Sequence, residues 1–365
     1  MLRQILKTVV RTAVSLLFRL YKRWWRPRSP AVFERILVFS TGGIGDTLSD
    51  TPAVRAVRQS FADARIEVVA DRRRAVIWEG NPDVAAVHTY RKSVLTFLRL
   101  AAAVRNRYDL SIVLRANDPD IYPLAYLASR NVLANPHRTQ MPFLVTRPHA
   151  DPRWRKRHGV EQMLDVVSEI GAKTSDPRLV LMISDREASE AEQRLRSSGV
   201  DPRAAVAVQV GGSGRQYWRE WPASSFAALL DLLHAARPEL TPILIGGLNL
   251  RDKACEILRL CRKAAPLNFV NATSLRQTAA LLSVAGAMVT TDTGIMHVGY
   301  AVGCPTVAIL HCSIPQTEVG PYGYDPKRYR ILELRPPQGM DCSESLTLAS
   351  IPPNLVLNAL LSLLT

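Results

Sequence analysis

Short apolar runs alternate with amphipathic stretches along the chain, and the two periodicities predict alternating strands and helices. In the first half, a buried strand at residues 35–40 leads through a glycine turn into a helix at about 47–58, and a second strand follows at 64–70. A strand, a helix and a strand at this spacing form a βαβ unit, which predicts a parallel sheet. Shorter strands are predicted at residues 84–90, 110–114 and 131–134, and 141–158 is predicted as loop.

The second half repeats the pattern. Strands are predicted at residues 205–210, 241–245, 268–270, 287–290 and, as the last of the series, 306–310. A chain of 365 residues exceeds the usual size of one hydrophobic core. We therefore expect two Rossmann-like α/β domains, at 31–180 and 181–335, with a tail and closing helix at 336–365. Their parallel sheets are expected to face a central cleft that binds the ligand at the carboxyl ends of the strands.

Residues 1–30 differ from the rest and are predicted as a helix and a linker. Apolar residues recur at helical spacing from Leu2 to Leu20, and residues 1–28 carry eight basic and no acidic side chains. The longest charge-free stretch, residues 12–18, is too short for a signal peptide core or a membrane span. The pattern favours a basic amphipathic helix on an anionic membrane surface. Docking on its own domain or on a partner protein is the alternative.

The composition narrows the class of partner. The net charge is +15, and a second basic run, with Arg153, Arg155, Lys156 and Arg157, suits anionic lipid or a phosphorylated acceptor. The basic residues cluster on one terminal helix rather than along a groove with stacking aromatics, so nucleic acid is not expected as a partner. Five cysteines without a C-x-x-C pair argue against a zinc site or a disulfide framework and fit a reducing cytoplasm.

Residues 290–297, with the sequence Thr-Thr-Asp-Thr-Gly-Ile-Met-His, lie where a predicted strand turns into a helix. Unpaired backbone N–H groups and the positive end of the helix dipole make such a turn an anion site, typically for phosphate. Thr293 is expected to cap the helix, Gly294 to admit a ligand, and His297 to face the same end. A capped structural helix with a packed histidine is the alternative.

Three glycine turns follow strands, at residues 42–45, 211–214 and 246–247, and each could cradle phosphate. Residues 43–48 lack the third glycine of a dinucleotide fingerprint, so a nicotinamide-dependent oxidoreductase is kept only as an alternative. Asp46 is predicted either as a helix cap or as a general base that faces the cleft. Arg219, just after the second glycine turn, could neutralise a leaving diphosphate.

These pieces occur in an order that is similar to a known family. The motifs are R-I-L-V-F…G-D-T-L…T-P-A-V-R-A-V-R at residues 35–58, Arg219-x-Trp221-Pro222, Ile-Gly-Gly at 245–247, Thr-Asp-Thr-Gly-x-x-His at 291–297, and Val-Gly-Pro-Tyr-Gly at 319–323. Together they resemble glycosyltransferase family 9, the heptosyltransferases of lipopolysaccharide synthesis. The resemblance implies a GT-B fold, with the acceptor on the first domain and a nucleotide-sugar on the second.

The resemblance also implies roles for individual residues. Asp46 matches the proposed base of an inverting displacement, and neither a metal nor a cofactor is expected. We expect the donor to bind at Gly211, Gly212, Ser213, Arg219, Gly246, Asn249, Asp292, Thr293, Gly294 and His297. We expect the acceptor to bind at Gly43, Gly45, Arg72 and Arg115.

Two positions depart from the family pattern. Ser40 stands where better-known members have a lysine, and residues 248–252 lack the glutamate that binds ribose, for which Asn249 or Asp252 could substitute. The expected protein is thus a glycosyltransferase on the cytoplasmic face of a bacterial inner membrane. It would move heptose or a related sugar from a nucleotide-sugar to a glycolipid or lipid-linked glycan. A non-catalytic nucleotide-sugar-binding protein is the alternative.

Overall fold

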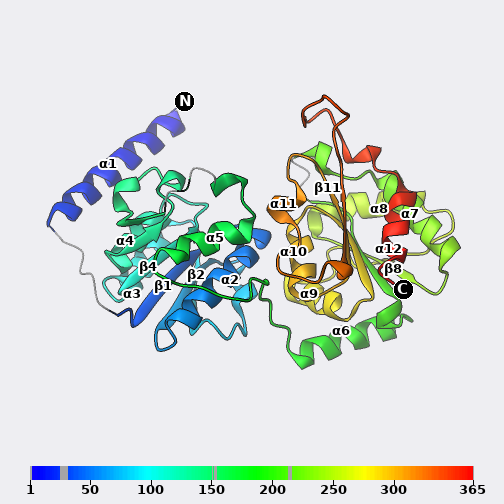
Figure 1. Ribbon diagram of the computed structural model, residues 1–365, viewed down its shortest axis with the longest axis horizontal. Coiled ribbons are helices and arrows are strands. Elements are labelled where there is room, and N and C mark those ends of the chain that lie inside the picture. Colours follow the sequence, from blue (N-terminus) through cyan, green and yellow to red (C-terminus); the bar gives the residue numbers. More distant parts are fainter. Residues whose placement is uncertain (1, 25–31, 150, 152–153, 213–215, 365) are drawn as a thin grey trace. The chain divides into compact units, whose positions relative to one another are not determined.

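A computed structural model describes residues 2–24, 32–149, 151, 154–212 and 216–364. The chain forms two compact units (Figure 1). The first comprises residues 1–43 and 49–175, and the second comprises residues 44–48 and 176–365. The central cleft expected from the sequence stays a prediction.

The first unit is built on a parallel six-stranded sheet in the order β3-β2-β1-β4-β5-β6. Alternate residues of each strand point to opposite faces, so the sheet separates two cores. Leu37 and Phe39 belong to one core, under α1 (Leu2–Trp24), α3 and α4. Ile36 and Val38 belong to the other, under α2 and α5. The elements are β1 (Arg35–Ser40), α2 (Ile44–Ser60), β2 (Arg65–Asp71), β3 (Ala86–Tyr90), α3 (Val94–Val104), β4 (Leu110–Arg115), α4 (Ile121–Ala128), β5 (Val132–Ala134), β6 (Arg147–Pro148) and α5 (Gly159–Ser168).

The second unit holds another parallel six-stranded sheet, in the order β12-β11-β10-β7-β8-β9. Helices α7, α8 and α12 cover the face that carries Val206, Val208 and Val289. The elements are α6 (Asp185–Ser197), β7 (Ala205–Gln209), α7 (Ala223–Ala236), β8 (Thr241–Ile245), α8 (Arg251–Leu260), β9 (Leu267–Asn268), α9 (Leu275–Val284), β10 (Ala287–Thr291), α10 (Gly294–Ala301), β11 (Thr306–Leu310), α11 (Gln316–Val319), β12 (Tyr329–Glu333) and α12 (Pro353–Leu361).

The two sheets have the same topology. If the strands of each unit are counted from one to six, both orders become 3-2-1-4-5-6. In this doubly wound arrangement the order reverses between the first and fourth strands, and ligands bind at the carboxyl ends beside that point. The reversal lies between β1 and β4 in the first unit and between β7 and β10 in the second.

Helix α1 (Leu2–Trp24) docks on the first unit through one stripe of its carboxyl-terminal half. Phe18 is buried, and its ring and that of Tyr21 make edge contacts with Tyr126 of α4 at centroid distances of 6.5 and 6.3 Å. A second stripe stays exposed, formed by Leu16, Leu17 and Leu20. The first stripe of α1 therefore docks on its own domain. The contact of α1 with a membrane stays a prediction. None of the described helices is long and apolar enough to cross a membrane.

Three expectations were wrong. The strand at residues 306–310 is not the last, because β12 pairs with it as an edge strand, and residues 147–148 within the expected loop form β6. The argument against disulfides fails at one pair: Cys312 and Cys342 form a disulfide across 30 residues of sequence. They come together because β11 ends beside the segment that leads to α12, which the spacing of the cysteines in the sequence does not reveal. Closing a loop of this length contributes about 3–4 kcal/mol to stability in a chain-entropy model.

Candidate functional site

The first site element lies where the first sheet reverses, at the ends of β1 and β4. The Ser40 hydroxyl donates to Oδ2 of Asp50 in α2 over 2.6 Å, and Asp50 Oδ1 lies 3.5 Å from Nε of Arg115. Asp50 is fully buried, and the backbone N–H of Thr41 donates to the Arg115 carbonyl over 3.0 Å. A buried ion pair of this kind fixes its partners, because loss of either leaves the other charge uncompensated. Arg115 is therefore held in place by Asp50.

Asp46 lies four residues before Asp50, in the segment 44–48 that groups with the second unit. It is the third residue of α2 and is half-buried, as are Gly43 and Gly45 beside it. The carboxylate stands in the first turn of a helix that begins at the carboxyl edge of the sheet, which is where a side chain can reach a ligand. The three predicted residues therefore lie together at the start of α2.

A wide basic hollow opens at the ends of β2 and β3. Two cavities of about 740 and 710 Å³ share Arg72, Arg91 and Lys92 in their walls. The Arg72 backbone N–H donates to the Tyr90 carbonyl over 2.8 Å, which sets the two strand ends side by side. Lys92 pairs with Asp118, but no acidic side chain in the described part of the chain pairs with Arg72 or Arg91. The hollow thus offers uncompensated positive charge, which suits phosphate.

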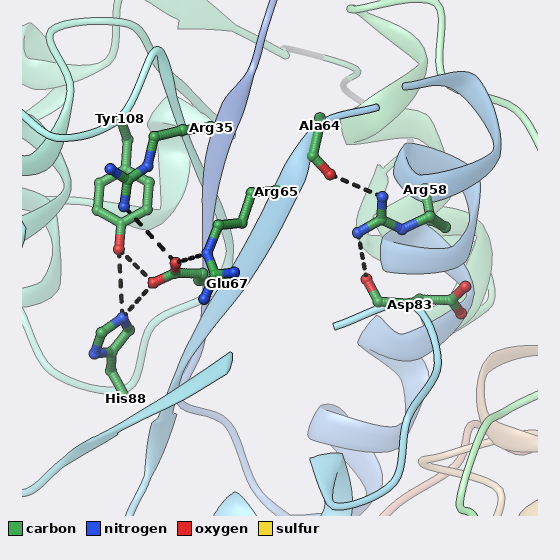
Figure 2. Close-up of polar contacts among 8 residues, drawn as sticks. All are labelled: Arg35, Arg58, Ala64, Arg65, Glu67, Asp83, His88 and Tyr108. Carbon is green, nitrogen blue, oxygen red and sulfur yellow. Dashed lines mark hydrogen bonds and ion pairs between the residues drawn. The ribbon is translucent and has the colours of Figure 1, made fainter. Parts of the chain in front are cut away.

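The buried carboxylate of Glu67 contacts His88 (Figure 2). His88 lines the larger cavity. Glu67 Oε2 accepts a hydrogen bond from the Tyr108 hydroxyl and lies 2.7 Å from His88 Nε2, while Oε1 accepts from Arg65 Nε over 2.6 Å. Burial alone would raise the pKa of Glu67, but the hydrogen bonds from Tyr108, Arg65 and His88 outweigh it and lower the pKa to about 2. Glu67 is therefore charged at neutral pH and orients the His88 ring at the cavity wall.

The second site element lies where the second sheet reverses, at the start of α10. Asp292 follows β10 and forms an ion pair with the Arg219 guanidinium, which also bonds to Gln216. Thr293 occupies the N-cap position with extended backbone, as expected, but its side chain makes no cap hydrogen bond. The prediction that the Thr293 hydroxyl caps α10 is therefore wrong. Its buried Oγ1 has no hydrogen-bond partner within the described residues.

Gly211 and Gly212, which follow β7, are held by side chains from the segments that lead into α7 and α8. Gly212 N–H donates to Glu220 Oε1 over 2.9 Å, and the other Glu220 oxygen pairs with Lys253 at the same distance. Gly211 has φ +153°, and a Cβ there would lie 2.4 Å from the Glu220 carboxylate, so only glycine fits. The Asn249 amide donates to the Gly212 carbonyl over 2.8 Å. Gly211 and Gly212 are thus held in place, and the Gly212 N–H is already used.

Two further predicted donor residues lie on other elements of the second unit. Gly246 follows β8 and accepts a backbone hydrogen bond from Asn271 over 2.8 Å. His297 is buried in α10, where its ring makes an edge contact with Tyr300 at a centroid distance of 6.1 Å. Ser213 lies outside the described residues, and Asp252 is exposed in the first turn of α8.

Another cluster lies after β11. His311 is buried, its Nε2 lies 2.9 Å from the Leu346 carbonyl, and its Nδ1 lies 3.9 Å from Cys312 Sγ and 4.0 Å from Cys342 Sγ. These three residues bring together atoms that could ligate a metal, but the two sulfur atoms are joined in the disulfide. In this oxidised form the cluster links the β11 loop to the tail.

A model of glycosyltransferase family 9 (heptosyltransferase) matches residues 98–345. The chain belongs to glycosyltransferase family 9. It is similar to lipopolysaccharide heptosyltransferase 3 of Escherichia coli, with 23% identity over 291 residues that cover 73% of this chain and 80% of the relative. The protein is therefore a glycosyltransferase of the heptosyltransferase type.

Solved structures agree with the fold of this family 9 enzyme. A glycosyltransferase family 9 protein from Veillonella parvula superposes with a TM-score of 0.78 at 20% identity, covering 91% of this chain and 97% of that one. The ADP-heptose lipopolysaccharide heptosyltransferase II of E. coli gives a TM-score of 0.75 at 21% identity, covering 90% and 98%. The predicted α/β fold with two Rossmann-like units of the GT-B type is confirmed.

The structure of this glycosyltransferase also contains site residues that sequence reasoning missed. Asp50 and Glu220 hold predicted residues in place, and Arg91 and Lys92 complete the hollow around Arg72. Glu220 lies between Arg219 and Trp221, within the Arg-x-Trp-Pro motif identified from the sequence. Its place in that motif is the sequence feature that could have indicated its role. Asp50 ends the G-D-T-L-S-D segment, where its buried pairing depends on β4 lying beside β1.

Proposed function

We propose that this glycosyltransferase moves heptose or a related sugar, with inversion and without a metal, from a nucleoside-diphosphate sugar to a lipopolysaccharide-type or other lipid-linked glycan. The observation that carries the proposal is the start of α10, where Asp292, Thr293 and Gly294 stand beside Arg219 at the reversal point of the second sheet. The relative named above as an ADP-heptose heptosyltransferase supports an adenosine diphosphate sugar as the donor.

The diphosphate would bind at the start of α10. The first N–H groups of a helix have no intrahelical acceptor, and the positive end of the dipole favours negative charge there. Arg219 adds a fork of donors, held in orientation by Asp292. Charge on the departing diphosphate grows in the transition state, so donors fixed beforehand stabilise that state more than the ground state.

The acceptor hydroxyl would be activated by Asp46. The oxygen of the acceptor hydroxyl attacks the anomeric carbon from the face opposite the diphosphate. The carbon–oxygen bond to the diphosphate breaks, and the proton of the acceptor hydroxyl passes to the Asp46 carboxylate. The diphosphate leaves with the electron pair of the broken bond. One inverted glycosidic bond results, and Asp46 then returns its proton to solvent.

The basic hollow supports a phosphorylated acceptor. Arg72 and Arg91 carry charge that no acidic side chain of the described chain neutralises, and a phosphate would supply the missing partner. We also propose that the enzyme works at the cytoplasmic membrane surface, with the basic residues of 1–28 close to anionic lipid. The exposed stripe at Leu16, Leu17 and Leu20 supports this contact.

The experiment has two stages. A thermal-shift screen of nucleoside diphosphates and their sugars should show ADP or ADP-heptose raising the melting temperature, because a ligand that binds the folded state stabilises it. Transfer of labelled sugar to purified glycolipid should then proceed equally with and without a chelator. The D46A variant should keep the nucleotide shift and lose transfer. A wild-type enzyme that binds nucleotide but transfers sugar to none of the glycolipids would contradict the proposal, as would loss of transfer on chelation.

A further inference from the structure

The outer side of α3 carries an apolar stripe that the fold leaves uncovered. Val94, Leu95 and Leu98 are 77%, 57% and 58% exposed. The same helix buries Leu100 and Val104 against the first sheet, so its core-facing contacts are already made on the opposite side. Isolated exposed apolar residues are ordinary, but three large ones within five positions of one helix form a patch that water contacts unfavourably.

Basic side chains precede and follow this stripe along the chain, without acidic ones between them. Residues 91–108 contain five basic residues and no aspartate or glutamate, and the five are Arg91, Lys92, Arg99, Arg105 and Arg107. All five are exposed. A helix with an apolar stripe and a cationic border has the composition of an element that lies in the interface of an anionic bilayer, with apolar side chains among the acyl chains and cations at the headgroups.

The position of α3 beside the basic hollow gives a functional reason for a membrane contact at this helix. The larger cavity runs along α3 from Arg91–Ser93 to Ala103, with the edge strand β3 forming its other wall. A lipid-anchored molecule whose acyl chains stay in the bilayer at Val94, Leu95 and Leu98 would have its polar part at the mouth of this cavity. Helix α1 packs on the same face of the sheet, so its exposed leucines lie on the same side of the unit.

We propose that the outer face of α3 is a second membrane contact, which seats the first unit on an anionic bilayer and brings a phosphorylated glycolipid to the hollow. The glycolipid part of this inference rests on the proposed function, whereas the bilayer contact does not. An anionic bilayer fits better than a protein partner because all five charged residues of segment 91–108 are basic, and among them only Lys92 forms an ion pair, with Asp118, in the described part of the chain. A uniformly negative surface would supply counterions to the other four.

The test compares variants of the full chain by sedimentation with phosphatidylcholine vesicles, with and without phosphatidylglycerol. The wild type should bind the anionic vesicles and bind the zwitterionic ones much more weakly. The double variant L95E/L98E should bind anionic vesicles at least roughly tenfold more weakly, since it puts two carboxylates where apolar groups enter the bilayer. R105Q/R107Q, which leaves the hollow intact, should weaken binding roughly fivefold per charge at low salt.

Matched controls separate this contact from non-specific effects and from α1. L248E/L355E changes two exposed leucines of the second unit, which are 64% and 46% exposed, and should bind as the wild type does. L17E/L20E reports the contribution of α1. If L95E/L98E binds as tightly as L248E/L355E, or if only the α1 variant loses affinity, the inference is overturned. Melting curves show whether each variant is folded.

Activity provides the second measurement. L95E/L98E should lower kcat/KM for glycolipid in vesicles and leave kcat/KM unchanged for a delipidated acceptor oligosaccharide in solution. Equal loss on both acceptors would contradict a membrane role for α3. A wild-type enzyme that transfers sugar to neither acceptor would instead remove the proposed function, and the vesicle measurement would still decide the bilayer contact.

Discussion

The two units share one strand order, but the charged residues at the carboxyl edge of the sheet are arranged differently in each. In the second unit the charges at the edge are paired with one another, Arg219 with Asp292 and Lys253 with Glu220. In the first unit Arg72 and Arg91 face a cavity of about 740 Å³ with no acidic partner among the described residues. The buried carboxylates Asp50 and Glu67 contact other residues instead. The same topology thus carries mutually paired charges at the edge of the second sheet and unpaired positive charges at the edge of the first.

The difference suits two kinds of ligand. Paired charges hold donor groups in one orientation, which favours a ligand of constant shape whose charge changes during reaction. Unpaired cations spread over a wide hollow attract anionic groups without demanding one geometry, and they act mainly on affinity and on the rate of encounter. We therefore expect mutations at the second edge to affect the chemical step, and those at the first to affect acceptor binding.

The largest effect is expected at the paired edge. Replacing Arg219 with alanine removes the side chain that we propose as a donor to the diphosphate, and it leaves the Asp292 carboxylate without its partner. We expect kcat/KM to fall about 10²–10³-fold, mostly in kcat. Steady-state kinetics with both substrates varied will measure this. R219K should recover only part of the loss because lysine lacks the planar fork, and R186A, at an exposed pair with Glu190, serves as the control. A change confined to the acceptor KM would contradict the assignment.

The next effect concerns the charge buried behind the hollow. Replacing Glu67 with glutamine leaves Arg65 and Tyr108 without the carboxylate they contact, and it should lower the free energy of unfolding by roughly 3 kcal/mol at neutral pH. Because the pKa of Glu67 is lowered to about 2 when folded, its contribution is complete above the unfolded pKa near 4.5 and is lost as pH falls from about 5 towards 2. Urea unfolding of both proteins across that range measures it, and a constant difference between them would refute the prediction.

The smallest effect is expected at the unpaired edge. Replacing Arg72 with alanine removes one of several cations, so the KM for a phosphorylated acceptor should rise about tenfold while kcat and the donor KM stay unchanged. The effect should shrink at high salt, because exposed charges are screened. R237A, which alters an exposed ion pair with Glu239 in the second unit, is the matched control. A fall in kcat as large as that of R219A would remove the distinction between the two edges.

Much of this arrangement follows from local sequence. β1, β7 and β11 are five- or six-residue apolar runs buried on both faces, and such runs are predictable without knowledge of their neighbours. Strand β12 was not predicted because it lies at the edge of the sheet and carries Arg330 and Glu333, so its sequence pattern is that of a loop. The start of α10 was predictable because capping and glycine signals are contiguous in sequence.

The partners of these residues were not predictable, since they depend on strand order. Glu220 contacts Lys253 across 33 residues, and Tyr108 contacts Glu67 across 41. Arg72 and Arg91 share a cavity only because β2 and β3 are neighbours in the sheet. Sequence therefore indicated candidate ligand-binding residues at the edges, while the side chains that hold those residues became visible only in the fold.

The disulfide has a mechanical consequence. Edge strand β12 lies within the loop that Cys312 and Cys342 close, whereas α12 lies outside it. Tension applied to the carboxyl terminus would peel α12 away and then pass through the sulfur–sulfur bond to the end of β11. Strand β12 would bear none of that load while the bond is intact. In a force-extension trace, reduction should therefore lengthen the chain released from the second unit by the contour of the 30 residues that the bond had shielded.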